Sequence, residues 1–468
     1  MNPKVFREYD VRGTVDQDLN DDFVFNLGRA SGTYAGSKGV RTMTLGRDCR
    51  LSSGRYGEAM REGLLSTGID VIDLGMCATP ILYFSIRELK AGGGVMITGS
   101  HNPPEFNGFK ICVGPDTIYG EDIQDLRRIM ESGAYASGRG KSRQEDVSGR
   151  YKELIFNNVR IKPGIDVAVD AGNGVGGIFA LPILERFGCS VTPLYCDVDG
   201  RFPNHFPDPT VPENLRELIQ IVKKKGSDAG IAFDGDADRI GVITDKGEIL
   251  WGDELLLFFS RFVLQENPGA AVIGEVKCSH RLYNDIERHG GRAVMWKAGH
   301  SLIKGKMKEI KALLAGEMSG HVFFADRYFG YDDAIYAAAR LLEILSRTGK
   351  KISEIMADVP RTFNTPEIRV DCPDAVKFEV VEDLKEGLKK EHKIIDLDGV
   401  RIPFEDGWGL IRASNTQPVL VLRFEASTPG RLAEIRNIIE SALAETMKKF
   451  APDGNRIHSS ATTENTMR

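Results

Sequence analysis

The sequence contains an apolar run that ends in a polar loop displaying one serine. Residues 93–97 (Gly-Gly-Val-Met-Ile) are followed by Thr98, Gly99 and Ser100. Gly99 frees the backbone and the prolines at 103 and 104 stop both helix and strand, so Ser100 is predicted to lie on a stiff turn after a buried strand. The pattern suits a nucleophile, but taken alone it is better explained as an ordinary turn or cap. Adjacent side chains usually point apart, so His101 is not expected to act as the base of Ser100.

A second apolar run, residues 230–233, ends in three alternating carboxylates, Asp234, Asp236 and Asp238. Alternate residues of extended backbone face the same way, and three convergent carboxylates repel one another unless a hard cation lies between them. Oxygen-only ligands favour Mg²⁺ over zinc. An EF-hand is excluded, because it needs glycine at its sixth position, where Arg239 stands, and glutamate at its twelfth, where Asp245 stands. A phosphatase with Asp234 as its nucleophile stays open.

Two further loops carry residues suited to recognition. Glu317 and Ser319 lie two residues apart, a spacing that can hold vicinal hydroxyls of a sugar, although such a pair on a turn is more often local backbone capping. Between strand-like runs at 409–411 and 419–423 lies a loop rich in donors for an anion such as phosphate. Its donors, with one from the following strand, are Arg412, Ser414, Asn415, Thr416 and Arg423.

Basic residues also lie beside turns at several other places in the chain. Together they predict a positive cleft in an otherwise acidic protein, as a phosphorylated substrate requires. They are Arg12, Lys110, Lys277, Lys297 and His300.

Strand-like runs alternate with helix-like segments through about the first three quarters of the chain, which predicts stacked α/β units. Three of these runs end in the polar loops that hold Ser100, Asp234 and Glu317. Ligands gather beyond the carboxyl ends of strands in open α/β sheets, so the loops are expected to face one cleft. After Pro366 the pattern changes to a strand at 368–370, a helix at 375–392, short strands and a last helix at 430–450.

The predicted fold is therefore α/β, with three related mixed α/β domains and a smaller C-terminal α+β domain around one central cleft. The expected boundaries place the serine loop in 1–155, the carboxylate loop in 156–258, the Glu317 loop in 259–366 and the anion loop in 367–450. Residues 451–468 are polar without a periodic apolar face and are expected to form a flexible tail.

Composition limits the classes of function. The chain has 468 residues, a formal net charge of −6 and a pI of about 5.9, without basic runs, which argues against nucleic acid or an anionic membrane as its main partner. Its start lacks an apolar signal region, so a cytoplasmic protein is expected. The seven cysteines are dispersed without a C-x-x-C pair, so neither disulfides nor a zinc knuckle is indicated.

In this order the loops resemble the α-D-phosphohexomutase superfamily, most closely its phosphomannomutase/phosphoglucomutase branch. The resemblance spans nearly the whole chain and rests on four motifs. They are Thr98-Gly99-Ser100-His101-Asn102-Pro103, Asp234-Gly235-Asp236-Ala237-Asp238-Arg239, Gly316-Glu317-Met318-Ser319-Gly320-His321 and Arg412-Ala413-Ser414-Asn415-Thr416.

The resemblance implies a role for each loop. Ser100 would carry the transferable phosphoryl group and, with Asp234, Asp236 and Asp238, bind Mg²⁺. Glu317 and Ser319 would hold the sugar 3- and 4-hydroxyls, and the 412–416 loop, with Arg423, would bind the nonreacting phosphate. The other site residues implied are Tyr9, Arg12, Lys110, Arg239, Lys277 and His300, of which Lys110 and His300 are the two candidates for the general base.

The implied reaction interconverts hexose 1-phosphate and hexose 6-phosphate of mannose or glucose, with hexose 1,6-bisphosphate as intermediate and activator. Two alternatives remain: a phosphoglucosamine mutase of the same superfamily, and a metal-dependent sugar-phosphate phosphatase. A noncatalytic sugar-phosphate sensor is disfavoured by the intact Ser100 and the three aspartates. The chain is expected to act as a monomer or small homo-oligomer without nucleic acid or membrane partners.

Overall fold

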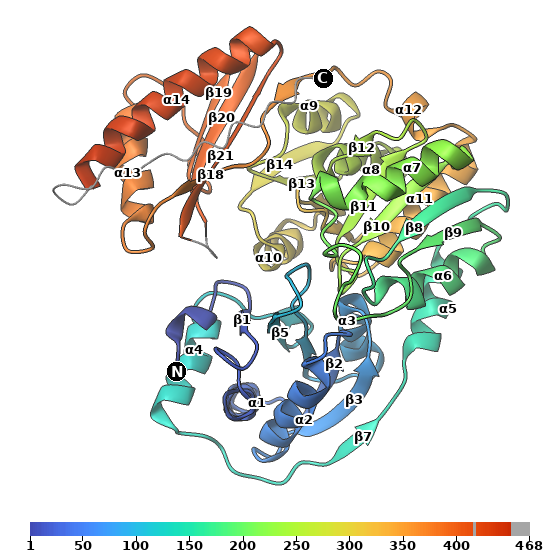
Figure 1. Ribbon diagram of the computed structural model, residues 1–468, viewed down its shortest axis with the longest axis vertical. Helices are drawn as coiled ribbons and strands as arrows, with labels where there is room; N and C mark the ends of the chain where they lie inside the picture. Colours follow the sequence, from blue (N-terminus) through green and yellow to red (C-terminus); the bar gives the residue numbers. More distant parts are fainter. Residues whose placement is uncertain (415–417, 451–468) are drawn as a thin grey trace. The chain divides into compact units, whose positions relative to one another are not determined.

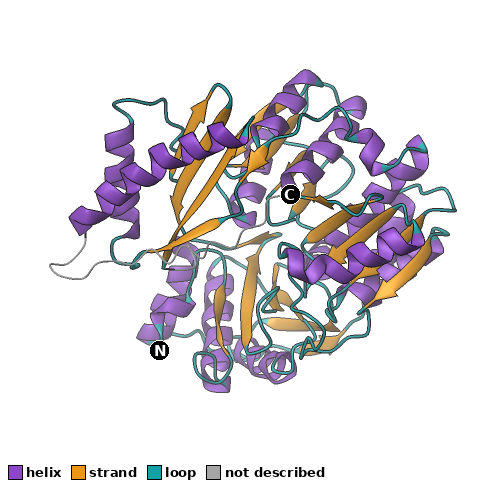
Figure 2. Cartoon of the chain, turned by 45° about the horizontal axis from the view of Figure 1, so that its top comes forward, coloured by secondary structure: helices purple, strands orange, loops and turns teal. Residues whose placement is uncertain are grey.

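The computed structural model describes residues 1–414 and 418–450. In these described ranges four sheets follow one another, each packed with helices (Figures 1 and 2). These residues divide into two compact units: 1–274, 282–294 and 299–358 form the first, and 275–281, 295–298, 359–414 and 418–450 form the second.

The first sheet has the order β1-β5-β4-β2-β3-β7, with β6 paired to β5. Its helices α1 and α2 pack against each other, and α2 and α3 pack on the strands (Figure 1). Its strands are β1 (Val11–Thr14), β2 (Thr42–Arg47), β3 (Asp70–Met76), β4 (Gly93–Ile97), β5 (Phe106–Val113), β6 (Asp116–Thr117) and β7 (Ser142–Gln144). The helices are α1 (Asp21–Ser37), α2 (Ser53–Leu65), α3 (Thr79–Glu88) and α4 (Glu121–Ser132), preceded by a 3₁₀ turn at Pro3–Val5.

The second and third sheets repeat the central part of the first. The orders β9-β8-β10-β11-β12 and β14-β13-β15-β16 correspond to β3-β2-β4-β5. The strands are β8 (Asp166–Asp170), β9 (Ser190–Leu194), β10 (Ala229–Phe233), β11 (Ile240–Thr244), β12 (Ile249–Leu250), β13 (Ala271–Glu275), β14 (Arg292–Trp296), β15 (Leu314–Gly316) and β16 (Val322–Phe324). The helices are α5 (Ser148–Asn158), α6 (Gly176–Arg186), α7 (Arg216–Lys225), α8 (Gly252–Glu266), α9 (His280–Arg288), α10 (His300–Ile310), α11 (Ala334–Thr348) and α12 (Ile352–Ile355), with a 3₁₀ turn at Pro212–Leu215.

The repeated order explains why the polar loops come where they do. In each sheet the strand β4, β10 or β15 runs parallel to one neighbour and is joined by a loop to an antiparallel neighbour, β5, β11 or β16. The Ser100, Asp234 and Glu317 loops are these three connections. The prediction of three related α/β domains is confirmed.

The fourth sheet has the order β17-β21-β20-β19, with β18 paired to β21. Helices α13 and α14 lie side by side against it (Figure 1) and cover a core that includes Leu384, Leu422 and Ile439. The elements are β17 (Phe363–Asn364), β18 (Ile368–Asp371), α13 (Lys377–Leu388), β19 (Val400–Phe404), β20 (Gly407–Ala413), β21 (Val419–Ala426) and α14 (Pro429–Phe450). The predicted C-terminal α+β domain is confirmed.

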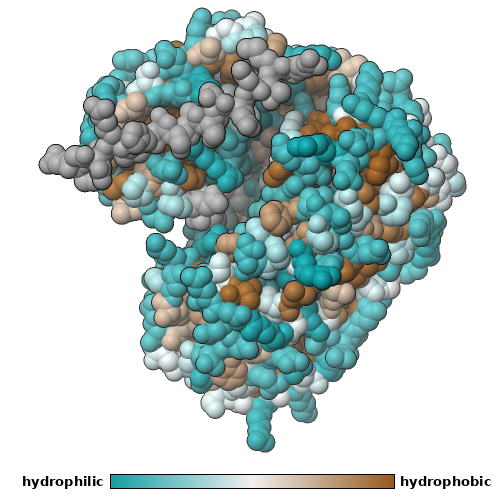
Figure 3. All heavy atoms as spheres, viewed as in Figure 1, coloured by the Kyte–Doolittle hydropathy of each residue, from teal (hydrophilic) through white to brown (hydrophobic). Residues whose placement is uncertain are grey.

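Two of the predicted boundaries, 155/156 and 258/259, fall within α5 and α8. The residues at which one domain gives way to the next, the shared cleft and the tail at 451–468 stay predictions, and the tail lies outside the described residues. In the described ranges no helix is long and apolar enough to cross a membrane. The face in Figure 3 is mostly hydrophilic, with hydrophobic residues in small groups.

Candidate active site

The serine loop follows β4 and holds Ser100 in an unusual backbone conformation. Ser100 has φ of +50°, in the left-handed region that non-glycine residues rarely adopt, and it is 2% exposed. Its backbone N–H donates to Thr98 Oγ1 at 2.8 Å, and its Oγ donates to Asp234 Oδ2 at 2.7 Å. The serine loop and the carboxylate loop, which the sequence predicted to face one another, are therefore in contact within the first unit.

The expectation that His101 points away from Ser100 is wrong. Ser100 Oγ lies 3.1 Å from His101 Nδ1, because the left-handed backbone at Ser100 breaks the alternation of side chains that extended chain would impose. Burial, followed by the charges of Arg239 and Arg12, lowers the pKa of His101 well below its usual value. The imidazole is therefore neutral near pH 7.

The carboxylate loop follows β10 and is fully buried. Asp234, Asp236 and Asp238 are each 0% exposed, and their oxygens lie within 4.8 Å of one another. Asp234 Oδ1 accepts the backbone N–H groups of Asp238 and Arg239 at 3.1 and 3.0 Å. This local turn, with Ala237 at φ of +57°, brings the three side chains together.

These residues fit a hard divalent cation. Among the described residues Asp236 Oδ1 and Asp238 Oδ1 are buried without a hydrogen-bond partner, an arrangement that costs free energy unless another group meets them. Burial, and then the neighbouring carboxylates, raise the pKa of Asp234 well above its usual value. Clustered acidic oxygens with free lone pairs are the donor set that Mg²⁺ prefers.

Lys110, on β5, partly neutralises the cluster. Its Nζ donates to Asp236 Oδ2 at 2.7 Å and also contacts Asp238 Oδ2. Burial lowers the pKa of Lys110, but Asp236 and Asp238 raise it, and the net shift is upward. The side chain is therefore an ammonium ion in this arrangement.

Arg12 contacts the serine loop, and Tyr9 lies beside the first residue of α10. Arg12 Nη1 donates to Asn102 Oδ1 of the serine loop at 2.5 Å, and Asp10 pairs with its Nη2 at 2.6 Å. The ring of Tyr9 lies 5.9 Å from the ring of His300, which begins α10.

The Glu317 loop is joined to the carboxylate loop through the backbone. The N–H of Ile240, which follows Arg239, donates to Gly320 O at 3.0 Å. Gly320 has φ of +90°, and a Cβ there would lie 2.5 Å from Ile240 O, so only glycine allows this approach. Glu317 is 6% exposed, and its Oε1 accepts the N–H of Gly299 at 2.7 Å, while Ser319 is half-buried.

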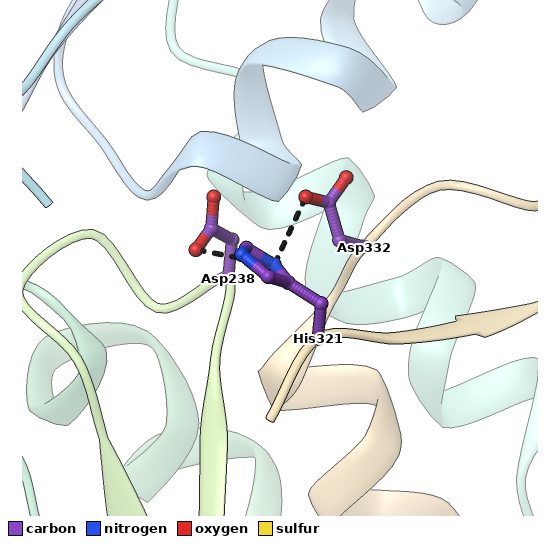
Figure 4. A group of neighbouring side chains, drawn as sticks. All are labelled: Asp238, His321 and Asp332. Carbon is purple, nitrogen blue, oxygen red and sulfur yellow. Dashed lines mark ion pairs between the residues drawn. The ribbon is translucent and has the colours of Figure 1, made fainter. Parts of the chain in front are cut away.

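His321 links this loop to two aspartates (Figure 4). Its Nδ1 lies 3.2 Å from Asp332 Oδ2 and 3.6 Å from Asp238 Oδ1, while its Nε2 accepts from Arg239 Nε at 3.1 Å. Arg239 therefore lies beside the carboxylates as predicted. The His300 ring stacks on His321 with centroids 5.5 Å apart.

The second unit contains the anion loop. Arg412 Nε donates to Asp398 Oδ2 at 3.0 Å, and Arg423 Nη1 donates to the carbonyl of Lys277 at 3.0 Å. Ser414 N–H donates to Val419 O at 3.0 Å and closes the hairpin. Lys277, Arg412, Ser414 and Arg423 thus belong to one compact unit. Asn415 and Thr416 lie outside the described residues.

Comparison with known proteins agrees with this arrangement. Models of the phosphoglucomutase/phosphomannomutase family match the chain four times: its alpha/beta/alpha domains I, II and III match residues 3–136, 150–247 and 251–363, and its C-terminal domain matches residues 367–442. A phosphomannomutase/phosphoglucomutase from Pseudomonas aeruginosa is 48% identical over 440 residues, which cover 94% of this chain and 95% of that protein. The chain belongs to the phosphoglucomutase/phosphomannomutase family.

Other relatives match a similarly large share of this chain. A phosphoglucomutase from Neisseria gonorrhoeae is 47% identical over 444 residues, covering 94% of this chain and 96% of the relative. The crystal structure of a phosphoglucomutase/phosphomannomutase family protein from Burkholderia thailandensis is 38% identical, has a TM-score of 0.91, and matches 98% of this chain and 100% of that one.

Sequence reasoning missed several residues of the site of this family member. Asp332 is fully buried, and Lys304 Nζ donates to its Oδ1 at 3.1 Å. The adjacent Asp333 caps α11 by accepting the N–H of Tyr336, so the Asp-Asp pair resembles an ordinary helix start. His321 was within a recognised motif, but only its contacts reveal a role.

Proposed function

We propose that this enzyme interconverts hexose 1-phosphates and hexose 6-phosphates of mannose and glucose, through a phosphoserine at Ser100 and a bound hexose 1,6-bisphosphate. The observation that carries the proposal is the 2.7 Å hydrogen bond from Ser100 Oγ to Asp234, one of three buried carboxylates with oxygens available to a cation. Bound there, Mg²⁺ would supply positive charge against the phosphoryl oxygens during transfer.

In the first half of the reaction a sugar hydroxyl oxygen forms a bond to phosphorus, and the bond from phosphorus to Ser100 Oγ breaks. The electron pair of the broken bond stays on Oγ, and the hydroxyl proton passes to a base. The second half reverses these events with the other phosphate of the bisphosphate. Arg12, tied to the serine loop through Asn102, can bind phosphoryl oxygens, since it is always charged.

Of the two candidate bases, His300 is favoured over Lys110. Burial lowers the pKa of His300 well below its usual value, with the charge of Lys304 next in importance, so its imidazole is neutral near pH 7. Its Nδ1 has no hydrogen-bond partner among the described residues. Lys110 already holds its protons against Asp236 and Asp238 and cannot accept another.

We expect the pH profile of kcat/KM to report this base. A base whose pKa is lowered stays active as the pH falls past 6.5, and activity is lost only as the pH falls through the lowered value. His300→Gln is expected to reduce kcat about 10²-fold and to remove that acid limb. Steady-state rates from pH 5 to 9 check it. A Lys110→Met variant that loses the limb, with His300→Gln retaining it, would assign the base to Lys110.

Glu317 and Ser319 are proposed to bind the sugar 3- and 4-hydroxyls. These contacts do not test C2, where glucose and mannose differ, so dual specificity is expected. Free hexose 1,6-bisphosphate is proposed as an activator, because it can return a phosphoryl group to Ser100 after an intermediate escapes. A cytoplasmic monomer or small homo-oligomer remains the expectation.

The experiment that tests the function is a side-by-side assay of the purified enzyme with Mg²⁺. Mannose 1-phosphate and glucose 1-phosphate are expected to give the 6-phosphates at comparable kcat/KM, and glucosamine and N-acetylglucosamine 1-phosphates at values at least about tenfold lower. Faster turnover of glucosamine 1-phosphate would favour the phosphoglucosamine alternative.

The same assay separates a mutase from a phosphatase when Arg412→Ala is included. A mutase must hold a second phosphate, so losing this charged contact should lower mutase kcat/KM about 10- to 100-fold. Release of inorganic phosphate would be the main product of a phosphatase and would barely respond to the substitution.

A further inference from the structure

Arg50 is a buried arginine that the serine loop surrounds and that no sequence motif marked. It is 2% exposed, and all five of its guanidinium N–H donors are used. Nη2 donates to the carbonyls of Ser100 and Asn102 at 2.8 and 2.5 Å. Nη1 donates to the carbonyls of Pro103 and Phe106 at 2.6 and 2.9 Å. One side chain therefore binds three carbonyls of the loop that displays Ser100 and the carbonyl of Phe106, where β5 begins.

The fifth donor fixes the guanidinium itself. Arg50 Nε donates to Asp48 Oδ2 at 3.1 Å, and Asp48 also accepts the backbone N–H of Arg50 at 3.0 Å and the Ser53 hydroxyl at 2.6 Å. Asp48 lies directly after β2, so the pair projects from the sheet strand next to β4. The serine loop is thus held by residues that follow β2, a strand that comes about fifty residues earlier in the sequence.

Gly99 allows the guanidinium of Arg50 to approach the loop backbone closely. A Cβ at Gly99 would lie 2.6 Å from both Cζ and Nε of Arg50, too close for any side chain. The glycine before the serine therefore allows the guanidinium to lie against the loop backbone.

The loop needs such support, because Ser100 occupies a left-handed conformation at φ of +50°. Strained backbone at a functional position persists only where its surroundings over-determine it. Without the guanidinium, the carbonyls of Ser100, Asn102 and Phe106 would each lose a hydrogen bond, while Pro103 O would keep the backbone N–H of Phe106 at 3.0 Å. A lysine offers three donors at one point and cannot span them.

We propose that Arg50 is a positioning residue, which sets the backbone of the serine loop so that Ser100 Oγ lies against Asp234 for phosphoryl transfer. This inference rests on the proposed function of Ser100. Arg50 contacts the reacting group only through the loop backbone. Loosening the loop should slow transfer without weakening substrate binding, because the substrate contacts proposed for Glu317 and Arg412 lie elsewhere in the sequence.

The test compares Arg50→Lys in the full-length enzyme with Arg261→Lys as a matched control. Arg261 is a buried arginine whose guanidinium binds Asp285, Asp358 and the carbonyl of Ile355, away from the serine loop. Arg50→Lys is expected to lower kcat about 10²-fold while KM stays within about twofold. Amide hydrogen exchange at residues 99–106 should accelerate about tenfold or more. Arg261→Lys should change neither quantity.

The proposal would be overturned if Arg50→Lys lowered kcat and accelerated amide exchange at residues 99–106 no more than Arg261→Lys does. It would also be overturned if the whole loss of kcat/KM came from an increase in KM. If Arg50→Lys does not fold, Asp48→Asn replaces it and should show the same pattern with a smaller kcat loss. Wild type and Ser100→Ala are measured alongside. An inactive wild type would refute the proposed function, whereas the exchange comparison would still decide whether Arg50 orders the loop.

Discussion

Replacement of Ser100 by alanine is expected to reduce mutase turnover by at least about 10⁴-fold. The hydroxyl is the atom that would accept and return the phosphoryl group in every cycle, and removing a nucleophile eliminates the pathway rather than weakening one contact. Substrate binding should survive, because Ser100 is 2% exposed and its Oγ contacts only Asp234 and His101 among the described residues. The measurement is kcat with mannose 1-phosphate and glucose 1-phosphate in the presence of Mg²⁺.

Two control variants make this result specific. Ser85→Ala removes another buried serine hydroxyl, which donates to Leu82 O within α3, and should leave turnover unchanged. Ser100→Thr keeps a hydroxyl but places a β-branched side chain at φ of +50°, so it too should lose most activity. Intact-mass analysis should find one added phosphoryl group on the wild type and none on Ser100→Ala. Wild-type turnover by Ser100→Ala would show that the phosphoryl carrier is another residue.

The sequence was sufficient to predict the candidate site residues that are grouped in short segments directly after strands. The loops at Ser100, Asp234 and Glu317 concentrate polar residues directly after apolar runs, and the structure places each between a strand and its antiparallel neighbour. The same connection recurs in three sheets, which is why the fold could be predicted from the loops and their order.

Partners from distant parts of the chain were not predictable in this way. Thr79 precedes Pro80 and resembles a helix start, yet its hydroxyl donates to Asp236 Oδ2 at 2.5 Å, 157 residues away. In the sequence Arg50 resembles a surface residue of a turn, yet it is buried and donates hydrogen bonds to carbonyls of the distant serine loop. Such contacts depend on which strands and which sheets become neighbours in the fold, and local residue types do not indicate this.

The side-chain geometry around Ser100 also differed from the simple expectation. Alternation predicts that neighbouring side chains diverge, but the rule applies to extended backbone only. The left-handed φ of Ser100 follows from hydrogen bonds to Thr98 and Arg50, so the contact with His101 could not be foreseen from adjacency.

Asp238→Asn is expected to abolish the response of the enzyme to Mg²⁺. Asp238 contributes a buried oxygen without a hydrogen-bond partner among the described residues, and it shares Lys110 with Asp236. An amide offers one neutral oxygen in place of two charged ones, so it binds a hard cation less well. Loss of the transition-state charge stabilisation that a metal supplies, about 4 kcal/mol, corresponds to about 10³-fold in kcat.

Thermal unfolding provides a readout that is independent of turnover. A ligand that binds only the folded protein stabilises it by about 2.7 kcal/mol at a concentration 100 times its Kd, so Mg²⁺ should raise the Tm of the wild type after treatment with EDTA. Asp238→Asn should lose this rise.

Asp245→Asn is the matched control for Asp238→Asn. Asp245 occupies the twelfth position counted from Asp234, where an EF-hand would place a cation ligand. In the structure it binds Ser353 instead, accepting the backbone N–H at 2.9 Å and the hydroxyl at 2.7 Å. Asp245→Asn should therefore keep both the Mg²⁺-dependent turnover and the Mg²⁺-dependent rise in Tm. If Asp238→Asn kept them as well, the cation would bind somewhere other than the three carboxylates, and the charge-offsetting role proposed for this loop would be wrong.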